Sequence, residues 1–354
     1  MNKDAIELII KAEETHELSK AEIAFLLQDN SCNEALFNAA DRVRIKYVGD
    51  EVHLRGLIEF SNTCKQNCHY CGLRRDNKNV TRYRLEPETI IDFAEKAASY
   101  GYKTVVLQSG EDPYYTSDIM CSLIKEIKKL DLAITLSIGE KTREEYAAYR
   151  QAGADRFLLR IETTNKELYE KYNPGMSFEN RLSCLYTIKE LGYETGTGCL
   201  IGIPGQTEED LAGDIMFFRE LGADMIGVGP FIPNHNTPLG NENNGEFELA
   251  LKVMSITRLL LPDINIPATT AMETLNPNGR ILALKSGANV VMPNVTEGEY
   301  RKFYELYPGK ICVNDTPAHC RQCISGKIGA IGRKVSTGHG FREKKCCKNS
   351  DCKN

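Results

Sequence analysis

Short apolar runs alternate with longer stretches of helical periodicity along most of the chain. Eight runs have the composition of buried strands and are bounded by turn formers. They cover residues 53–60, 103–108, 133–138, 156–160, 194–201, 225–229, 264–270 and 289–292. Apolar residues at helical spacing fill the segments between them, for example 87–100, 117–129, 178–191, 207–221 and 246–260. Gly101, Gly153, Gly192 and Gly222 each precede a strand, where a left-handed helix cap is expected.

Eight successive strand and helix units predict an α/β fold with a parallel (β/α)8 TIM barrel. A doubly wound open sheet is the alternative. Helical spacing over residues 3–47 predicts a helical N-terminal extension, residues 1–50, before a barrel over 51–310. Residues 311–354 form a C-terminal segment that is basic and glycine-rich from Ser325 onward, and we expect part of it to be disordered.

Composition narrows the choice of partners. The net charge of -5 leaves no broad basic excess, so nucleic acid is not an expected partner. The N-terminus lacks the apolar core of a signal peptide, and no stretch approaches the ~18 apolar residues of a membrane span. We therefore expect a cytoplasmic protein with no membrane contact. In that setting the 13 cysteines point to metal ligands, catalytic groups and buried thiols rather than disulfides.

Three cysteines directly after the first strand carry the main chemical signal. Cys64, Cys68 and Cys71 have C-x3-C-x2-C spacing. Three thiolates can hold three corners of a 4Fe-4S cluster and leave the fourth iron open to a small molecule. A structural zinc site that includes His69 is the alternative, although such sites usually have a second paired arm.

A second group, Cys312, Cys320 and Cys323, has C-x7-C-x2-C spacing. We expect an auxiliary iron-sulfur cluster there rather than three free thiols, with 2Fe-2S and 4Fe-4S both open. The other cysteines lack partner spacing, and core packing is the expected role of Cys32, Cys121, Cys184 and Cys199. In the basic tail, Cys346, Cys347 and Cys352 fit either metal binding or a frayed end.

The first motif, with Tyr70 before its last cysteine, resembles the signature of the radical S-adenosylmethionine (SAM) superfamily. The resemblance implies that SAM binds the open iron and is cleaved to methionine and a 5'-deoxyadenosyl radical. Ser109, Gly110 and Glu111 resemble the segment that receives the methionine amino group. Further cofactor contacts are implied for Ser137, Glu140, Arg160, Glu162, Arg181 and Cys199. An internal ion pair at the barrel rim is the alternative role for the charged residues.

Longer stretches, among them IEFSNTCKQNCHYCGLRRDNKN, VVLQSGEDPYY, GPFIPNHNTPL and LYPGKICV, resemble the HydE type of FeFe-hydrogenase maturase over residues 51–323. That family encloses a large cavity in its barrel. The resemblance places these residues around the substrate: Gln108, Thr135, Thr269, Thr270, Met292, Tyr304 and Tyr307. Adjacent threonine hydroxyls beside an arginine suit the carboxylate of a cysteine-like amino acid, although buried threonines also bond to backbone.

The implied activity is assembly of the dithiolate-bridged di-iron centre from a small organometallic substrate, an iron-carbonyl-cyanide precursor that carries a cysteine. The radical would attack sulfur rather than abstract hydrogen. A low-potential electron donor and other hydrogenase maturases are the implied partners. Some family members carry an auxiliary cluster that activity does not need. Ile161 departs from the histidine expected there, which leaves substrate handling open.

Two alternatives remain at this level. One is a related barrel radical enzyme of the biotin synthase, methylornithine synthase or amino-acid lyase type, which would share the cluster motif. The other is an iron-sulfur scaffold or electron carrier without turnover. That protein would need no SAM site, so the residues after the second, fourth and fifth strands would have no shared purpose.

Overall fold

Parallel strands close into a ring in the computed structural model, which describes residues 2–344. Six of them pair in this order: β1 (Glu51–Ser61), β2 (Thr104–Ser109), β3 (Ala133–Ser137), β4 (Arg156–Leu158), β5 (Glu194–Thr197) and β7 (Met225–Ile226). Residues 264–268 continue the ring through parallel bridges from Asn265 to β7 and from Pro267 to β9 (Val290–Val291). β9 pairs with β1 at His53. This closure confirms the predicted barrel and excludes the open sheet.

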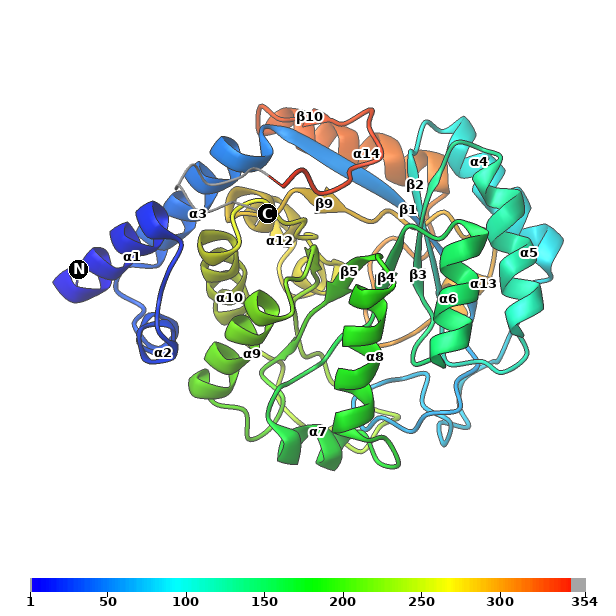
Figure 1. Cartoon of the computed structure of the whole chain (residues 1–354), viewed down its shortest axis with the longest axis horizontal. Coiled ribbons are helices and arrows are strands. Elements are labelled where there is room, and N and C mark those ends of the chain that lie inside the picture. Colours follow the sequence, from blue (N-terminus) through cyan, green and yellow to red (C-terminus); the bar gives the residue numbers. More distant parts are fainter. Residues whose placement is uncertain (1, 345–354) are drawn as a thin grey trace.

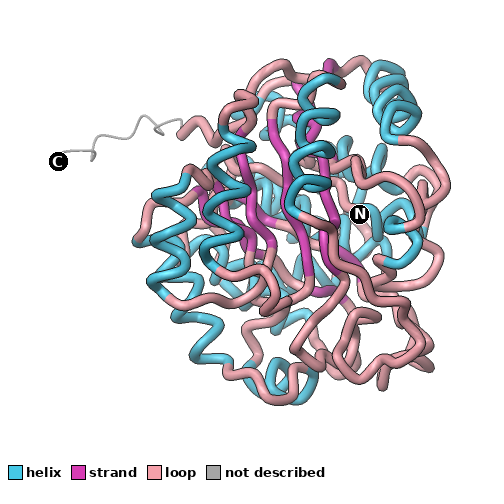
Figure 2. Tube along the Cα trace, turned by 90° about the vertical axis from the view of Figure 1, so that its right-hand side faces the viewer, coloured by secondary structure: helices cyan, strands magenta, loops and turns pink. Residues whose placement is uncertain are grey.

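Helices surround the ring on its outside (Figures 1 and 2). They are α4 (Pro87–Ser99), α5 (Ser117–Lys128), α6 (Arg143–Ala152), α7 (Lys166–Tyr172), α8 (Phe178–Glu190), α9 (Glu208–Glu220), α10 (Phe247–Leu260), α11 (Thr270–Leu275), α12 (Gly279–Lys285), α13 (Tyr300–Phe303) and α14 (Pro317–Ala330). Local sequence fixes many of their ends. In α6, Thr142 and Glu145 form a capping box, and Gly153 closes the helix at φ +118°. All four glycines predicted to cap helices have positive φ.

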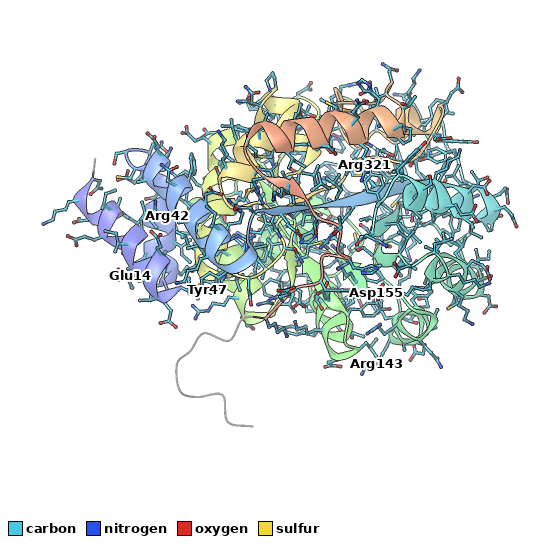
Figure 3. All side chains as sticks on the ribbon, turned by 90° about the horizontal axis from the view of Figure 1, so that it is seen from above. Glu14, Arg42, Tyr47, Arg143, Asp155 and Arg321 are labelled. Atoms are coloured by element: carbon cyan, nitrogen blue, oxygen red, sulfur yellow. The ribbon has the colours of Figure 1, made fainter. Side chains whose placement is uncertain are left out.

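The predicted helical extension is confirmed as α1 (Lys3–Thr15), α2 (Lys20–Gln28) and α3 (Asn33–Val48). α2 packs against α9 and α3 against α10, so these helices widen one side of the barrel. Figure 3 shows side chains of these helices from above, with Glu14, Arg42 and Tyr47 labelled. None of the helices between residues 2 and 344 is long and apolar enough to cross a membrane. The division at residues 50 and 310 stays a prediction.

The strand predicted over residues 194–201 is wrong in its middle. β5 ends at Thr197, and β6 (Leu200–Ile201) pairs with β8 (Gly229–Pro230) in a separate small sheet. The chain breaks its regular course at Gly198, where any Cβ would overlap the carbonyl oxygen of Gly227. Such close approach of two backbones needs glycine. Thr270, assigned to the end of a strand, instead begins α11.

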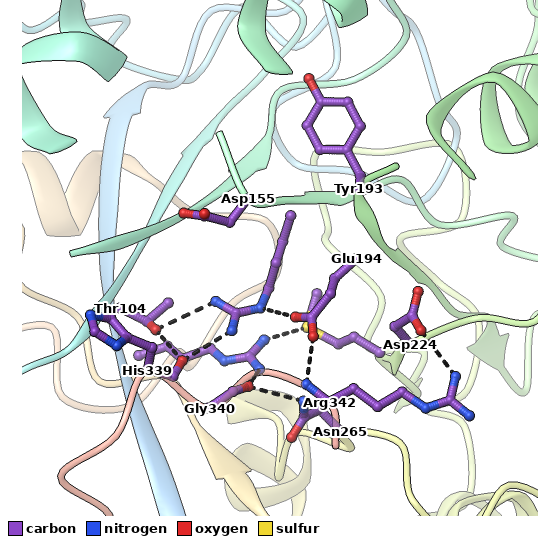
Figure 4. A network of polar contacts seen from close by, with 12 residues as sticks. Thr104, Asp155, Tyr193, Glu194, Asp224, Asn265, His339, Gly340 and Arg342 are labelled. Atoms are coloured by element: carbon purple, nitrogen blue, oxygen red, sulfur yellow. Dashed lines mark hydrogen bonds and ion pairs between the residues drawn. The ribbon is translucent and has the colours of Figure 1, made fainter. Parts of the chain in front are cut away.

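The partial disorder expected after Ser325 does not fall within residues 325–344. They complete α14, form β10 (Lys334–Val335) beside the start of β1, and then cross the amino ends of the strands. Figure 4 shows how this crossing is held. Buried Arg156 donates to the carbonyl of His339, and Arg342 pairs with Asp224. The C-terminal segment therefore seals the bottom of the barrel. Cys346, Cys347 and Cys352 lie outside the described residues.

Candidate active site at the carboxyl ends of the strands

The three motif cysteines lie in the loop between β1 and α4. One arginine organises this loop: Arg82 donates to the backbone carbonyls of Asn62, Leu73 and Arg74. Gly72 adds a backbone hydrogen bond to the carbonyl of Leu306, which follows β9, the neighbour of β1. Hydrogen bonds within the loop and to a neighbouring segment thus satisfy backbone groups that no helix or strand pairs. They hold the cysteines in position without regular secondary structure.

The donor set fits an iron-sulfur cluster better than a zinc ion. Ligands of one zinc ion lie about 3.8 Å apart. Among the described residues, neither the three sulfurs nor any set that includes His69 comes within 4.8 Å of one another. Burial raises the pKa of all three thiols, that of Cys68 to about 12. Thiolates there need a bound cation, and a cluster would supply it.

The segment after β2 lies directly against the cysteine loop. The backbone N–H of Glu111 donates to Cys64 Sγ at 3.4 Å. Gly110 leaves no room for a side chain, because a Cβ would overlap the Thr63 carbonyl oxygen and Cys64. The Glu111 carboxylate is itself fixed, since Gln66 donates to one oxygen at 2.6 Å and the backbone N–H of Glu140 to the other at 2.9 Å.

Two ion pairs stand across the next strand ends. Arg160 and Glu162 lie 3.0 Å apart after β4, and Arg181 of α8 pairs with Glu140 at 2.7 Å. Glu162 has φ +67°, a strained conformation for a residue other than glycine, and such strain often occurs at functional sites. Its backbone is held by hydrogen bonds to Gly198 and Leu200. The ion pairs given as the alternative role of these residues are therefore present. Arg160, Glu162 and Arg181 also line a cavity, so the ion pairs do not exclude a role in ligand binding.

A cavity of about 370 Å³ opens inside the barrel beneath the cysteine loop, within the usual range for a ligand site. Most predicted site residues line it: Cys64, Cys68, Tyr70, Cys71, Gln108, Ser109, Gly110, Glu111, Ser137, Arg160, Glu162, Arg181, Thr269, Thr270, Met292, Tyr304 and Tyr307. Three do not. Thr135 and Cys199 are fully buried beside it, and Glu140 contacts the lining residues Arg181 and Glu111 without lining the cavity itself.

Sequence analysis assigned no site role to some of the lining residues: Glu59, Gln66, Met176, Phe231, Ile232 and Lys310. Glu59 and Arg55 are the two charged residues within the predicted strand 53–60, and a buried charge of that kind is itself a signal. Glu59 pairs with Lys310, more than 200 residues away, a contact that sequence spacing cannot reveal. Ile161 is fully buried in the core and does not line the cavity, so its departure from the expected histidine leaves the cavity wall unchanged.

The second cysteine group lines a smaller, separate cavity. Cys312 Sγ, Cys320 Sγ and a carboxylate oxygen of Asp315 lie within 4.8 Å of one another, close enough for one metal centre. Cys323 follows Cys320 by one turn of α14 and faces the same cavity. The pKa of Cys320 is lowered because the Cys312 thiol and then the Arg301 guanidinium donate to its sulfur.

Comparison with known proteins shows to which family a chain with this site belongs. Residues 58–218 match the radical SAM superfamily model. The HydE subunit of the [FeFe] hydrogenase maturase of Thermotoga maritima is 54% identical over 97% of this chain and 98% of its own length. The chain belongs to the HydE family of radical SAM enzymes. The 3-methylornithine synthase of Methanosarcina acetivorans is a more distant relative, 33% identical over 73% of each chain.

Solved structures agree with a HydE-type barrel. Methylornithine synthase PylB superposes with a TM-score of 0.79 and 29% identity, covering 93% of this chain and 97% of its own. The maturase HydG gives 0.82 at 22% identity over 95% of this chain and 76% of its own, which speaks for the fold alone. Membership of the family brings a 4Fe-4S cluster and SAM as cofactors, and it excludes the carrier without turnover.

We expect Gly110→Ala to damage the cysteine loop. The added methyl group would push on the Thr63 carbonyl and on Cys64, and overpacking of this kind costs about 1–3 kcal/mol. Iron content after anaerobic reconstitution should fall more than about twofold. Gly329→Ala on α14 is the matched control, because nothing lies within 4 Å of its Cβ. Equal iron contents in the two variants would contradict the close approach.

Proposed function

We propose that this HydE-family enzyme acts in maturation of the FeFe-hydrogenase di-iron centre. The observation that carries the proposal is the 54% identity to the Thermotoga HydE subunit over nearly the whole of both chains. The substrate we propose is an iron-carbonyl-cyanide precursor that carries a cysteine. A cavity of about 370 Å³ enclosed by the barrel suits such a compact molecule and would shield it from water.

Residues at the upper end of the cavity would hold SAM. When bound, the cluster supplies the electron that cleaves SAM to methionine and the 5'-deoxyadenosyl radical. In our assignment the backbone of Ser109, Gly110 and Glu111 receives the methionine amino group, next to Cys64. Further positions assigned to SAM are Tyr70, Ser137, Glu140, Arg160, Glu162, Arg181 and Cys199. Glu140 and Cys199 would act indirectly, since Glu140 pairs with Arg181, and the Cys199 carbonyl accepts from Arg160.

The lower end would take the substrate. We assign Gln108, Thr269, Thr270, Met292, Tyr304 and Tyr307 to it, with Thr135 behind them. Two polar atoms of the cavity point to a ligand: Thr269 Oγ1, at this lower end, and Nε of Arg160, which also borders the SAM end, are buried without a hydrogen-bond partner in the described chain. Leaving such groups unpaired costs about 1–3 kcal/mol each. A carboxylate could satisfy both the hydroxyl and the guanidinium, as a cysteine-bearing substrate requires.

We further propose that Cys312, Cys320 and Cys323 hold an auxiliary iron-sulfur cluster, with Asp315 close enough to be a fourth ligand. A low-potential electron donor and the other hydrogenase maturases are the partners we propose. Exposed iron-sulfur sites and free thiols persist in reducing compartments, which favours the cytoplasm.

Anaerobic maturation tests the proposed function. Apo-hydrogenase would be matured in a mixture that contains the other maturases and lacks its HydE subunit, with this protein added. We expect hydrogen evolution to be restored by the wild-type protein and to stay at background with Cys68→Ala. An enzyme that cleaves SAM and yet restores no hydrogenase would act on a different substrate, and the methylornithine synthase likeness would then name the first class to try.

A further inference from the structure

The substrate cavity and the auxiliary cysteine cavity share a wall. Leu57, Thr270, Met292 and Lys310 line both of them. In this wall, the Thr270 hydroxyl accepts a hydrogen bond from a residue of the auxiliary cavity. Arg280, which lines only the auxiliary cavity, donates from its Nη2 to Thr270 Oγ1 at 3.0 Å.

This contact decides what Thr270 can offer to a ligand. A guanidinium is a donor only, so Thr270 Oγ1 must accept from it. The hydroxyl hydrogen of Thr270 is then available for an acceptor elsewhere. The neighbouring charge also favours an acceptor that is negative. Thr270 is thereby turned into a donor for an anion in the substrate cavity.

Arg280 is itself held in place from behind. It is 8% exposed, and its Nη1 lies 3.1 Å from Glu273 Oε2. The other Glu273 oxygen pairs with Lys327 of α14. Gly279 allows α12 to begin directly against the end of α11, because a Cβ there would overlap the Met272 carbonyl oxygen. The position of the guanidinium relative to Thr270 is therefore set by one buried ion pair, by a second pair that holds Glu273, and by one tight helix junction.

We propose that Arg280 is a positioning residue that makes the site specific for an anionic, carboxylate-bearing substrate by acting through the Thr270 hydroxyl. The proposal rests on the proposed function, because it requires the substrate to bind beside Thr270. Replacing Arg280 by methionine would leave Glu273 paired with Lys327, so no buried charge would lose its only partner.

A double-mutant cycle tests this. The protein with its reconstituted cluster and bound SAM is titrated with L-cysteine by calorimetry in four forms: wild type, Thr270→Val, Arg280→Met and the double variant. We expect each single substitution to weaken binding about tenfold, the effect of one charge-assisted hydrogen bond. When Thr270 is already valine, Arg280→Met should change the affinity less than about twofold, because the hydroxyl through which Arg280 acts is no longer there.

Lys285→Met is the control for charge alone, since it removes an exposed cation from the same helix and should leave the affinity unchanged. Iron content and the thermal midpoint report folding of every variant. Arg280→Gln, which keeps a donor for Thr270, replaces Arg280→Met if that variant does not fold, and it should bind better than Thr270→Val.

Each other outcome has one meaning. Additive losses would overturn the proposal, because Arg280 would then act without Thr270. A loss with Thr270→Val and none with Arg280→Met would overturn it while leaving the substrate site intact. If Thr270→Val binds like wild type, or wild type does not bind L-cysteine, the proposed substrate site itself fails, and the inference fails with it.

Discussion

Cys68→Ala should remove the catalytic cluster. Cys68 is one of three thiols tied into a single loop, and two remaining ligands cannot hold a cube that already has an open iron. The variant should bind iron only at other sites, lose the broad visible absorption of the loaded cluster, and form 5'-deoxyadenosine at less than about 1% of the wild-type rate. Iron and sulfide analysis, absorption spectra and chromatography measure these three quantities.

Cys121→Ala is the matched control. This thiol lies on α5, outside both cysteine groups, and does not line either cavity. We expect its iron content and product yield to equal those of the wild type. A loaded, active Cys68→Ala protein would mean that the cluster lies elsewhere in the chain.

Glu194→Ala should destabilise the whole barrel. Arg156 is fully buried at the bottom of the ring, and its Nε lies 2.5 Å from the carboxylate of Glu194. Arg55 lies buried nearby, and burial and then Arg156 lower its pKa. Removing the carboxylate takes away the anion that faces these buried cations. It also removes the acceptor of the hydrogen bond that the Arg342 backbone N–H donates to Glu194. Breaking a buried pair costs about 3–5 kcal/mol, which a urea unfolding midpoint would report.

Glu126→Ala gives the comparison. Glu126 pairs with Lys129 on the surface, where both side chains are well exposed, and such a pair contributes about 0–1 kcal/mol. Equal midpoints for the two variants would show that the seal of residues 336–342 contributes little to stability.

Local pattern predicted the ring and its helices well. Strands of three or more residues with apolar sequence, such as β2 and β3, were placed within one or two residues, because their signal lies within the segment itself. The helix ends at Gly101, Gly153, Gly192 and Gly222 were predicted for the same reason. The cysteine spacing, the strand ends and the family resemblance together named many of the residues that line the cavity, and their roles stay predictions.

Contacts between distant segments were not predictable from the chain pattern. The break at Gly198 depends on the approach of Gly227, and the seal at the bottom joins Gly340 to Arg55 and Asn265. Basic, glycine-rich sequence predicts disorder only when no partner exists, and here the strand ends provide one. Glu273 and Arg280 carried no motif, and only the fold brings them behind Thr270.

The measurement that tests the central claim most directly is SAM cleavage by the wild-type protein. The protein is reconstituted anaerobically with iron and sulfide, reduced with dithionite, given SAM, and assayed by chromatography for 5'-deoxyadenosine and methionine. We predict both products in equal amounts, increasing with time. A fully loaded and reduced cluster that yields neither would contradict the assignment of this protein as a radical SAM enzyme.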